Sequence, residues 1–130
     1  MLDAPTLSSF PTLRKTLLHI RDAENAWTCR LLGVAQSWPA DPSTALSSVM
    51  PFADRFAETV KAMDEDGLHR SHAYKDLKGN DHSSVAWRMI LHCVNHGTQH
   101  RGQLITMMRA LGLGEVPAND LIVFQRLQRL

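Results

Sequence analysis

HCVNHGTQHRGQLITMMRALG, residues 92–112, carries the clearest structural signal in the sequence. With the residues just before it, it carries one continuous stripe at spacings of three or four, the period of an amphipathic helix. The stripe consists of Met89, Cys93, His96, His100, Leu104, Met107 and Leu111. The spacing predicts the longest helix of the chain, capped by Ser83 or Ser84 and ending at Gly112.

Two histidines, His96 and His100, interrupt this apolar stripe. An imidazole buried without a partner costs about 1–3 kcal/mol, so both rings need one. Residues four apart on a helix lie on one side and can reach a common ion, as in helical His-x-x-x-His metal sites. Gly97 lies between them, and because a glycine inside a helix costs about 1 kcal/mol relative to alanine, we expect a local steric reason for it. The alternative is two histidines that are satisfied by hydrogen bonds alone.

An earlier helix is predicted by apolar residues that recur at helical spacing. Ser8 or Ser9 followed by Pro11 predicts its start, because serine caps free amide groups and proline suits the first turn. Gly33 is typical of a C-terminal stop. The apolar residues of this helix are Leu13, Leu17, Ile20, Trp27 and Leu31.

His19 lies beside the apolar stripe of this earlier helix and is the candidate for a third ligand. Ala23 and Ala26 follow on roughly the same flank, and their small side chains leave room for an ion and bound water. We therefore interpret His19, His96 and His100 as three ligands of one divalent metal ion. The alternative for His19 is a half-buried histidine bonded to a backbone carbonyl.

Two further polar side chains are expected around these ligands. Glu24 interrupts the stripe between Ile20 and Trp27, where an unpaired carboxylate is costly. The Glu24 carboxylate can be explained in two ways: it orients a ligand imidazole, or it forms a salt bridge with an arginine or lies at a helix end. His92, one turn before His96, is rotated to the edge of the stripe and is expected beside the ligands or at the surface. The other histidines fall in polar connecting segments and receive no role: His69, His72 and His82.

The rest of the chain is predicted to hold two further helices and their connections. The turn-forming segment VAQSWPADPST, which follows Gly33, is expected to be a surface loop, and apolar residues in 52–63 predict a second helix. Residues 68–82 permit a short hairpin or an ordered loop. A short last helix, capped by Asn119 or Asp120, is expected near the C-terminus.

Composition indicates one ordinary globular domain that spans residues 1–130, with 44% hydrophobic and 21% charged residues. A net charge of +1 with interspersed signs argues against a nucleic-acid partner. No apolar run approaches the roughly 20 residues of a membrane span and the start has no signal-peptide pattern, so we expect a cytoplasmic protein without membrane contact. Cys29 and Cys93 form no CxxC and are expected to be reduced, partly buried packing residues.

The run at 92–112, together with SFPTLRKTLLHIRDAENAW at 9–27, resembles the DinB family of small helical metalloproteins. The tail PANDLIVFQR is also similar to that family's closing segment. The resemblance implies an all-α bundle of the up-down-down-up four-helix type, here with three long helices and a short C-terminal helix. In that family a histidine on an early helix and the outer pair of an NHxxxHRGQ motif bind a divalent metal. These positions carry over to His19, His96 and His100.

The usual family member has an additional helix before the segment SFPTL, whereas this chain starts almost at that segment. We therefore expect one flank of the bundle to be exposed and to be covered by a second copy of the chain in a homodimer. The alternative is that the terminal segments close this flank.

Three histidine ligands leave coordination positions for water or substrate, as catalytic sites do. Relatives in the family include thiol transferases and thiol-dependent isomerases, which implies a metal-dependent thiol transferase or hydrolase acting on a small molecule, with a low-molecular-weight thiol as cofactor. We expect zinc or nickel. Arg101 and Gln103 are either substrate contacts or ordinary exposed or interhelical polar residues, and no catalytic residue is assigned. The alternative function is a non-catalytic scaffold or interaction module in which the metal staples two helices together.

Overall fold

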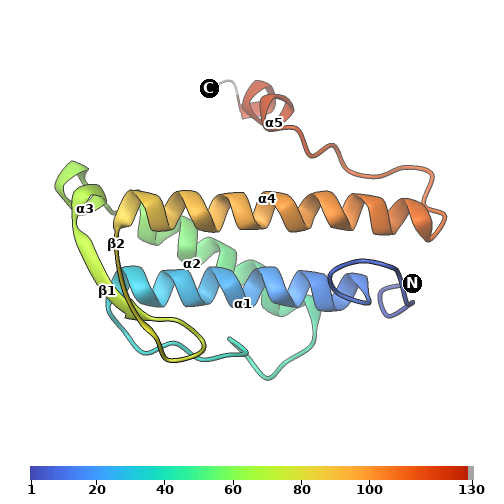
Figure 1. Ribbon diagram of the computed structural model, residues 1–130. Helices are drawn as coiled ribbons and strands as arrows, with labels where there is room; N and C mark the ends of the chain where they lie inside the picture. Colours follow the sequence, from blue (N-terminus) through green and yellow to red (C-terminus); the bar gives the residue numbers. More distant parts are fainter. Residues whose placement is uncertain (129–130) are drawn as a thin grey trace.

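The computed structural model describes residues 1–128 of the chain. Its elements are α1 (Leu13–Leu32), a 3-10 turn (Leu46–Ser48), α2 (Val49–Lys61), α3 (Glu65–His69), β1 (Ser71–Lys75), β2 (Asp81–Val85), α4 (Ala86–Ala110) and α5 (Leu121–Gln128). The long helices α1 and α4 lie side by side and run in opposite directions, and α2 runs behind α1 in the same direction as α1 (Figure 1). The predicted helical bundle is confirmed, with one antiparallel hairpin, β1–β2, added beside it.

Helix α1 starts later than the sequence predicts. Thr12 is its N-cap, and the Thr12 hydroxyl accepts a hydrogen bond from the Lys15 amide at 3.2 Å. The predicted cap at Ser8 or Ser9 is therefore wrong. The C-terminal stop at Gly33 is confirmed, because this residue adopts the left-handed conformation with φ 67°, which glycine tolerates without strain.

The start of α4 also differs from the prediction. Ser83 and Ser84 lie in β2, which runs directly into the helix, so neither of them caps it. The N-cap is Val85, whose side chain makes no capping hydrogen bond. The Ala86 amide instead donates to the Arg70 carbonyl at 2.9 Å. A backbone hydrogen bond from the first residue of α4 to the residue between α3 and β1 thus takes the place of the predicted serine cap.

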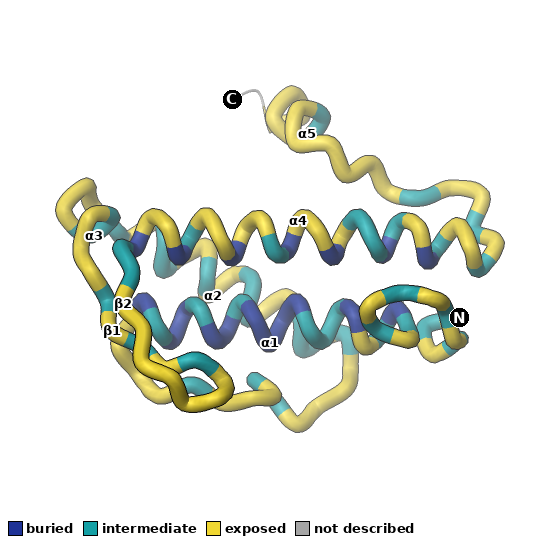
Figure 2. Tube along the Cα trace, viewed as in Figure 1, coloured by how far each residue is buried: buried dark blue, intermediate teal, exposed yellow. Residues whose placement is uncertain are grey.

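Facing sides of α1 and α4 form most of the core, as the buried residues in Figure 2 show. One buried cluster joins both helices near the N-terminus of α1; it contains Leu13, Ile20, Leu104 and Met107. A second lies at the hairpin end and contains Leu31, Ala86 and Met89. On α4 the segment with His96 and His100 separates the two clusters. Cys29 and Cys93 are free and buried, which confirms their predicted packing role.

Arg21 holds the long connection between α1 and α2 against the bundle. Its side chain is 2% exposed, and its guanidinium donates to the carbonyls of Ser43 and Asp41 at 2.7 and 3.0 Å. It also donates to the Ser48 hydroxyl at 2.7 Å and to the Asp22 carboxylate at 2.9 Å. Because these partners lie on the loop and on α1, the buried arginine fixes the loop that the sequence predicts only as irregular.

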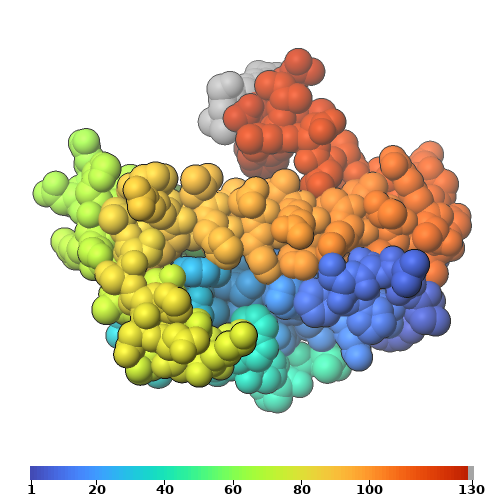
Figure 3. Space-filling model, in the orientation of Figure 1, coloured from blue at the N-terminus to red at the C-terminus, as the bar shows by residue number. Residues whose placement is uncertain are grey.

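Helix α5 is the predicted last helix, and none of its described residues is buried. It stands apart from the bundle beyond the segment that follows α4 (Figure 3). The N-terminal segment behaves differently, since the Arg14 amide donates to the Leu2 carbonyl at 3.0 Å and holds the segment near the start of α1. Within residues 1–128, no helix combines the length and apolar character that crossing a membrane requires.

Replacing Arg21 with alanine is expected to lower the free energy of unfolding by about 3–5 kcal/mol, because the buried Asp22 carboxylate and the loop carbonyls lose their donor. Urea denaturation measures this change. Arg14 provides a matched control on the same helix, because its ion pair with Asp3 is exposed to solvent, and Arg14→Ala is expected to cost much less than Arg21→Ala. Equal losses in the two variants would contradict the role assigned to Arg21.

Candidate metal centre

Three histidine rings converge between the two long helices. His19 comes from α1, whereas His96 and His100 come from successive turns of α4. The Nε2 atoms of His19 and His96 are 3.0 Å apart, and one nitrogen from each of the three rings lies within 4.8 Å of the others. His100 is buried at 7% exposure, and the other two rings are half-buried. The structure therefore brings together all three residues that the sequence singles out.

Small residues at this crossing explain part of the local geometry. Ala23 and Ala26 of α1 are buried in the interface between the helices. Gly97 of α4 is also buried, and a Cβ atom at this position would lie 2.8 Å from Nη1 of Arg101. The Arg101 guanidinium therefore fills the space beside this glycine, and because it is the end of a flexible side chain, this contact does not by itself require glycine.

Two aromatic side chains from outside the helices cover the histidines. The Phe10 ring lies 4.3 Å from the His19 ring and 5.6 Å from the His100 ring, between centroids. Trp38, from the loop that Arg21 holds, lies 5.9 Å from His19. Beside His19 these residues line an open cavity of about 460 Å³. The sequence pattern does not predict this role for either aromatic residue, because both lie in irregular segments where no periodicity indicates which way a side chain points.

Burial and mutual repulsion favour neutral imidazoles in this cluster. Burial lowers the pKa of His19, and repulsion by a charged His100 lowers it further, while Asp22 partly opposes the change. Burial also lowers the pKa of His96 to about 4, with added repulsion from the neighbouring histidines. Histidine binds metal ions in its neutral form, so at neutral pH the protonation state of both rings suits ligation.

The third ring, that of His100, has a hydrogen-bond partner on its own helix. Its Nδ1 lies 2.7 Å from Oε1 of Gln103. The Gln103 amide nitrogen in turn donates to the Ser9 hydroxyl at 2.8 Å. Gln103 therefore connects α4 to the N-terminal segment and not to another helix, and a contact with substrate stays a prediction.

The donor set fits a divalent metal ion. A tetrahedral ion with bonds of about 2.0–2.1 Å to nitrogen places its ligand atoms about 3.4 Å apart, so small ring rotations suffice to bring these three nitrogens around one ion. Imidazole suits zinc, nickel, copper and iron. Within residues 1–128, no other histidine, cysteine, aspartate or glutamate joins the group, so three is the number of protein ligands that this cluster offers.

Two further polar side chains, those of Glu24 and His92, are expected from the sequence beside the ligands. Within residues 1–128, neither of them forms a hydrogen bond with His19, His96 or His100. Burial raises the pKa of Glu24 to about 7, Arg101 partly opposes this shift, and Glu24 Oε2 is buried without a partner. His92 is exposed, with its ring 4.9 Å from Trp27 and 6.2 Å from His96. A supporting role for either residue stays a prediction. The three histidines without an assigned role lie, as expected, away from the cluster in α3 and the hairpin: His69, His72 and His82.

Comparisons with known proteins agree with this architecture. No curated protein matches the sequence. Among solved structures, a crystal structure of a DinB-like protein (YjoA) from Bacillus subtilis is similar, with a TM-score of 0.69 at 14% sequence identity. The similarity covers 92% of this chain and 82% of that chain, and at this identity it shows the shared fold. The model of the DinB family matches residues 1–128, and the chain therefore belongs to the DinB family.

Proposed function

We propose that His19, His96 and His100 bind a divalent metal ion, zinc or nickel, and that the protein is a metal-dependent enzyme that acts on a small molecule. The observation that carries the proposal is the convergence of three half-buried or buried imidazoles from two helices. His19 and His96 are within hydrogen-bond distance of each other and Nδ1 of His100 is bonded to Gln103, and one ion would join all three rings.

An open coordination sphere favours catalysis over a purely structural role. Structural zinc sites are closed by four protein ligands, whereas catalytic sites combine three with water or substrate. The cavity beside His19 gives a small molecule access to the cluster, and Phe10 and Trp38 provide apolar walls for it. A bound ion would supply Lewis-acid chemistry and activate a water or thiol ligand.

The nucleophile in this proposal comes from outside the chain. Both cysteines are buried, and burial raises the pKa of Cys93 to about 12, so its thiol stays protonated at neutral pH. A low-molecular-weight thiol or a water molecule fills this role, which corresponds to thiol transfer or hydrolysis. Free, buried thiols also agree with a reducing compartment such as the cytoplasm, where we place the protein.

Cobalt(II) loading tests whether the site is open. Added azide or 2-mercaptoethanol is expected to change the visible absorption of the bound cobalt in a saturable manner, because the ligand enters a position that protein atoms leave free. His100→Ala is expected to abolish cobalt binding, and His69→Ala, at an exposed position on α3, is the matched control that retains it. A cobalt spectrum that neither ligand changes would instead support the alternative function, a metal-stapled scaffold.

The proposal includes a homodimer. Trp87, Leu91 and Val94 form a second apolar stripe on α4, at spacings of four and three, and they are 40, 60 and 49% exposed. On α5, Leu121 and Phe124 are 68 and 54% exposed. Contiguous exposed apolar surface of this kind is typical of protein–protein contacts, so a second copy of the chain is expected to cover it.

Sedimentation velocity at micromolar concentration tests the dimer. The unmodified protein is expected to sediment as a dimer, and Leu91→Glu is expected to shift it to monomer because the new charge would be buried in the contact. Val34→Glu is the control, since Val34 is similarly exposed at 51% but lies on the loop after α1. A monomeric unmodified protein would contradict this part of the proposal.

A further inference from the structure

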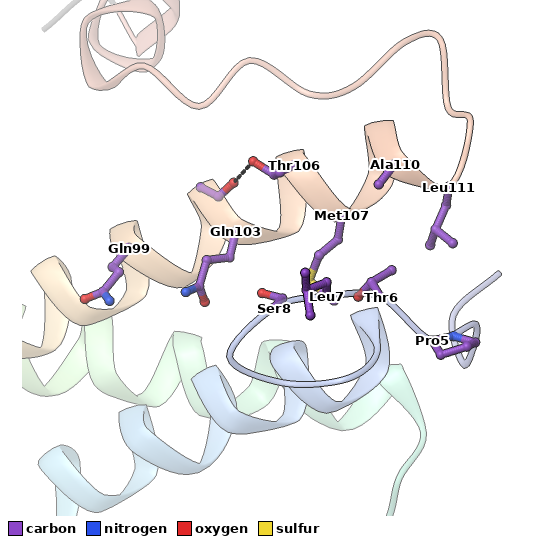
Figure 4. Close-up of a pocket in the computed structure, with 11 residues that line it drawn as sticks. Pro5, Thr6, Leu7, Ser8, Gln99, Gln103, Thr106, Met107, Ala110 and Leu111 are labelled. Atoms are coloured by element: carbon purple, nitrogen blue, oxygen red, sulfur yellow. Dashed lines mark hydrogen bonds between the residues drawn. The ribbon is translucent and has the colours of Figure 1, made fainter.

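Gln103 connects a candidate metal ligand to the N-terminal segment. Figure 4 shows its side chain pointing from α4 towards that segment, next to a cavity of about 710 Å³. Its Oε1 lies 2.7 Å from Nδ1 of His100, and its Nε2 lies 2.8 Å from the Ser9 hydroxyl. Gln99 lines the same cavity one turn earlier on α4 and is exposed.

The contact with Gln103 indicates which nitrogen of His100 carries the proton. A glutamine side chain has one acceptor, its oxygen, and one donor group, its nitrogen. The Gln103 oxygen faces Nδ1 of His100, and because an amide oxygen only accepts, Nδ1 carries the proton and donates to it, while the Gln103 nitrogen donates to Ser9. A neutral imidazole has only one N–H group, so Nε2 of His100 keeps its lone pair.

We propose that Gln103 is a positioning residue for the metal centre and that Ser9 holds it in place. The inference rests on the proposed metal site, in which His100 is a ligand. Gln103 fixes His100 in the form that presents Nε2 as the ligand atom, and it restricts rotation of the ring. Partners of ligand histidines typically contribute 10–100-fold to metal affinity, since they fix the tautomer and orientation of the ring.

Zinc affinity, measured by competition with a chromophoric chelator, tests the proposal. Gln103→Leu is expected to weaken binding about 10–100-fold, because Nδ1–H loses its acceptor. Gln103→Glu keeps an acceptor for Nδ1–H and is expected to retain most of the affinity. Gln99→Leu is the matched control on the same helix and cavity, and it is expected to leave the affinity unchanged. Ser9→Ala is expected to weaken binding less than Gln103→Leu, because only the anchor is lost.

Long-range ¹H–¹⁵N correlation spectra of the metal-free proteins provide a second readout that a packing role would not change. The unmodified protein is expected to hold His100 as the Nδ1–H tautomer, and Gln103→Leu is expected to give a mixture of tautomers. The Nε2–H tautomer in the unmodified protein, or equal affinities of the Gln103→Leu variant and the unmodified protein, would overturn the proposal. Equally weak binding by the Leu and Glu variants would overturn it as well. If the unmodified protein bound no zinc, the metal site itself would fail, whereas the tautomer measurement would still test the contact between Gln103 and His100.

Discussion

The candidate metal site depends on three imidazoles that face one another where α1 and α4 cross. His19 and His96 lie within hydrogen-bond distance of each other and His100 is bonded to Gln103, and a common ion would bind all three rings, whose nitrogens lie within 4.8 Å of one another. The apolar clusters on both sides align the helices so that His19 meets His96 and His100. Metal binding would therefore cross-link α1 and α4 in the segment that separates the two apolar clusters.

Irregular segments complete this centre, and polar contacts with the helices hold them. The loop after α1 brings Trp38 to His19, and the loop is fixed by the buried guanidinium of Arg21. The N-terminal segment brings Phe10 over the rings, and the bond between Ser9 and Gln103 ties this segment to α4. The two helices thus supply the candidate ligands, while the loops supply the walls of the cavity.

Helical periodicity predicts the parts of the molecule that local sequence determines. The stripe on α4, the stop at Gly33 and the convergence of the histidines follow from spacing and from the family resemblance. The serine cap of α4 was wrong because β2 continues to Val85 and leads directly into the helix. Arg21 donates to carbonyls of the loop after α1, and Gln103 donates to Ser9, which is far away in the sequence. No periodic pattern of residues predicts contacts of these two kinds.

X-ray absorption spectroscopy of the zinc-loaded protein tests whether the three histidines bind the ion. We expect one zinc per chain with three imidazole nitrogens at about 2.0–2.1 Å and one further light-atom ligand. Variants with alanine at position 19, 96 or 100 are expected to lose this signature, while His69→Ala retains it. A zinc shell made of sulfur or carboxylate oxygen, or an unchanged spectrum when His19 and His96 are both replaced, would contradict the account.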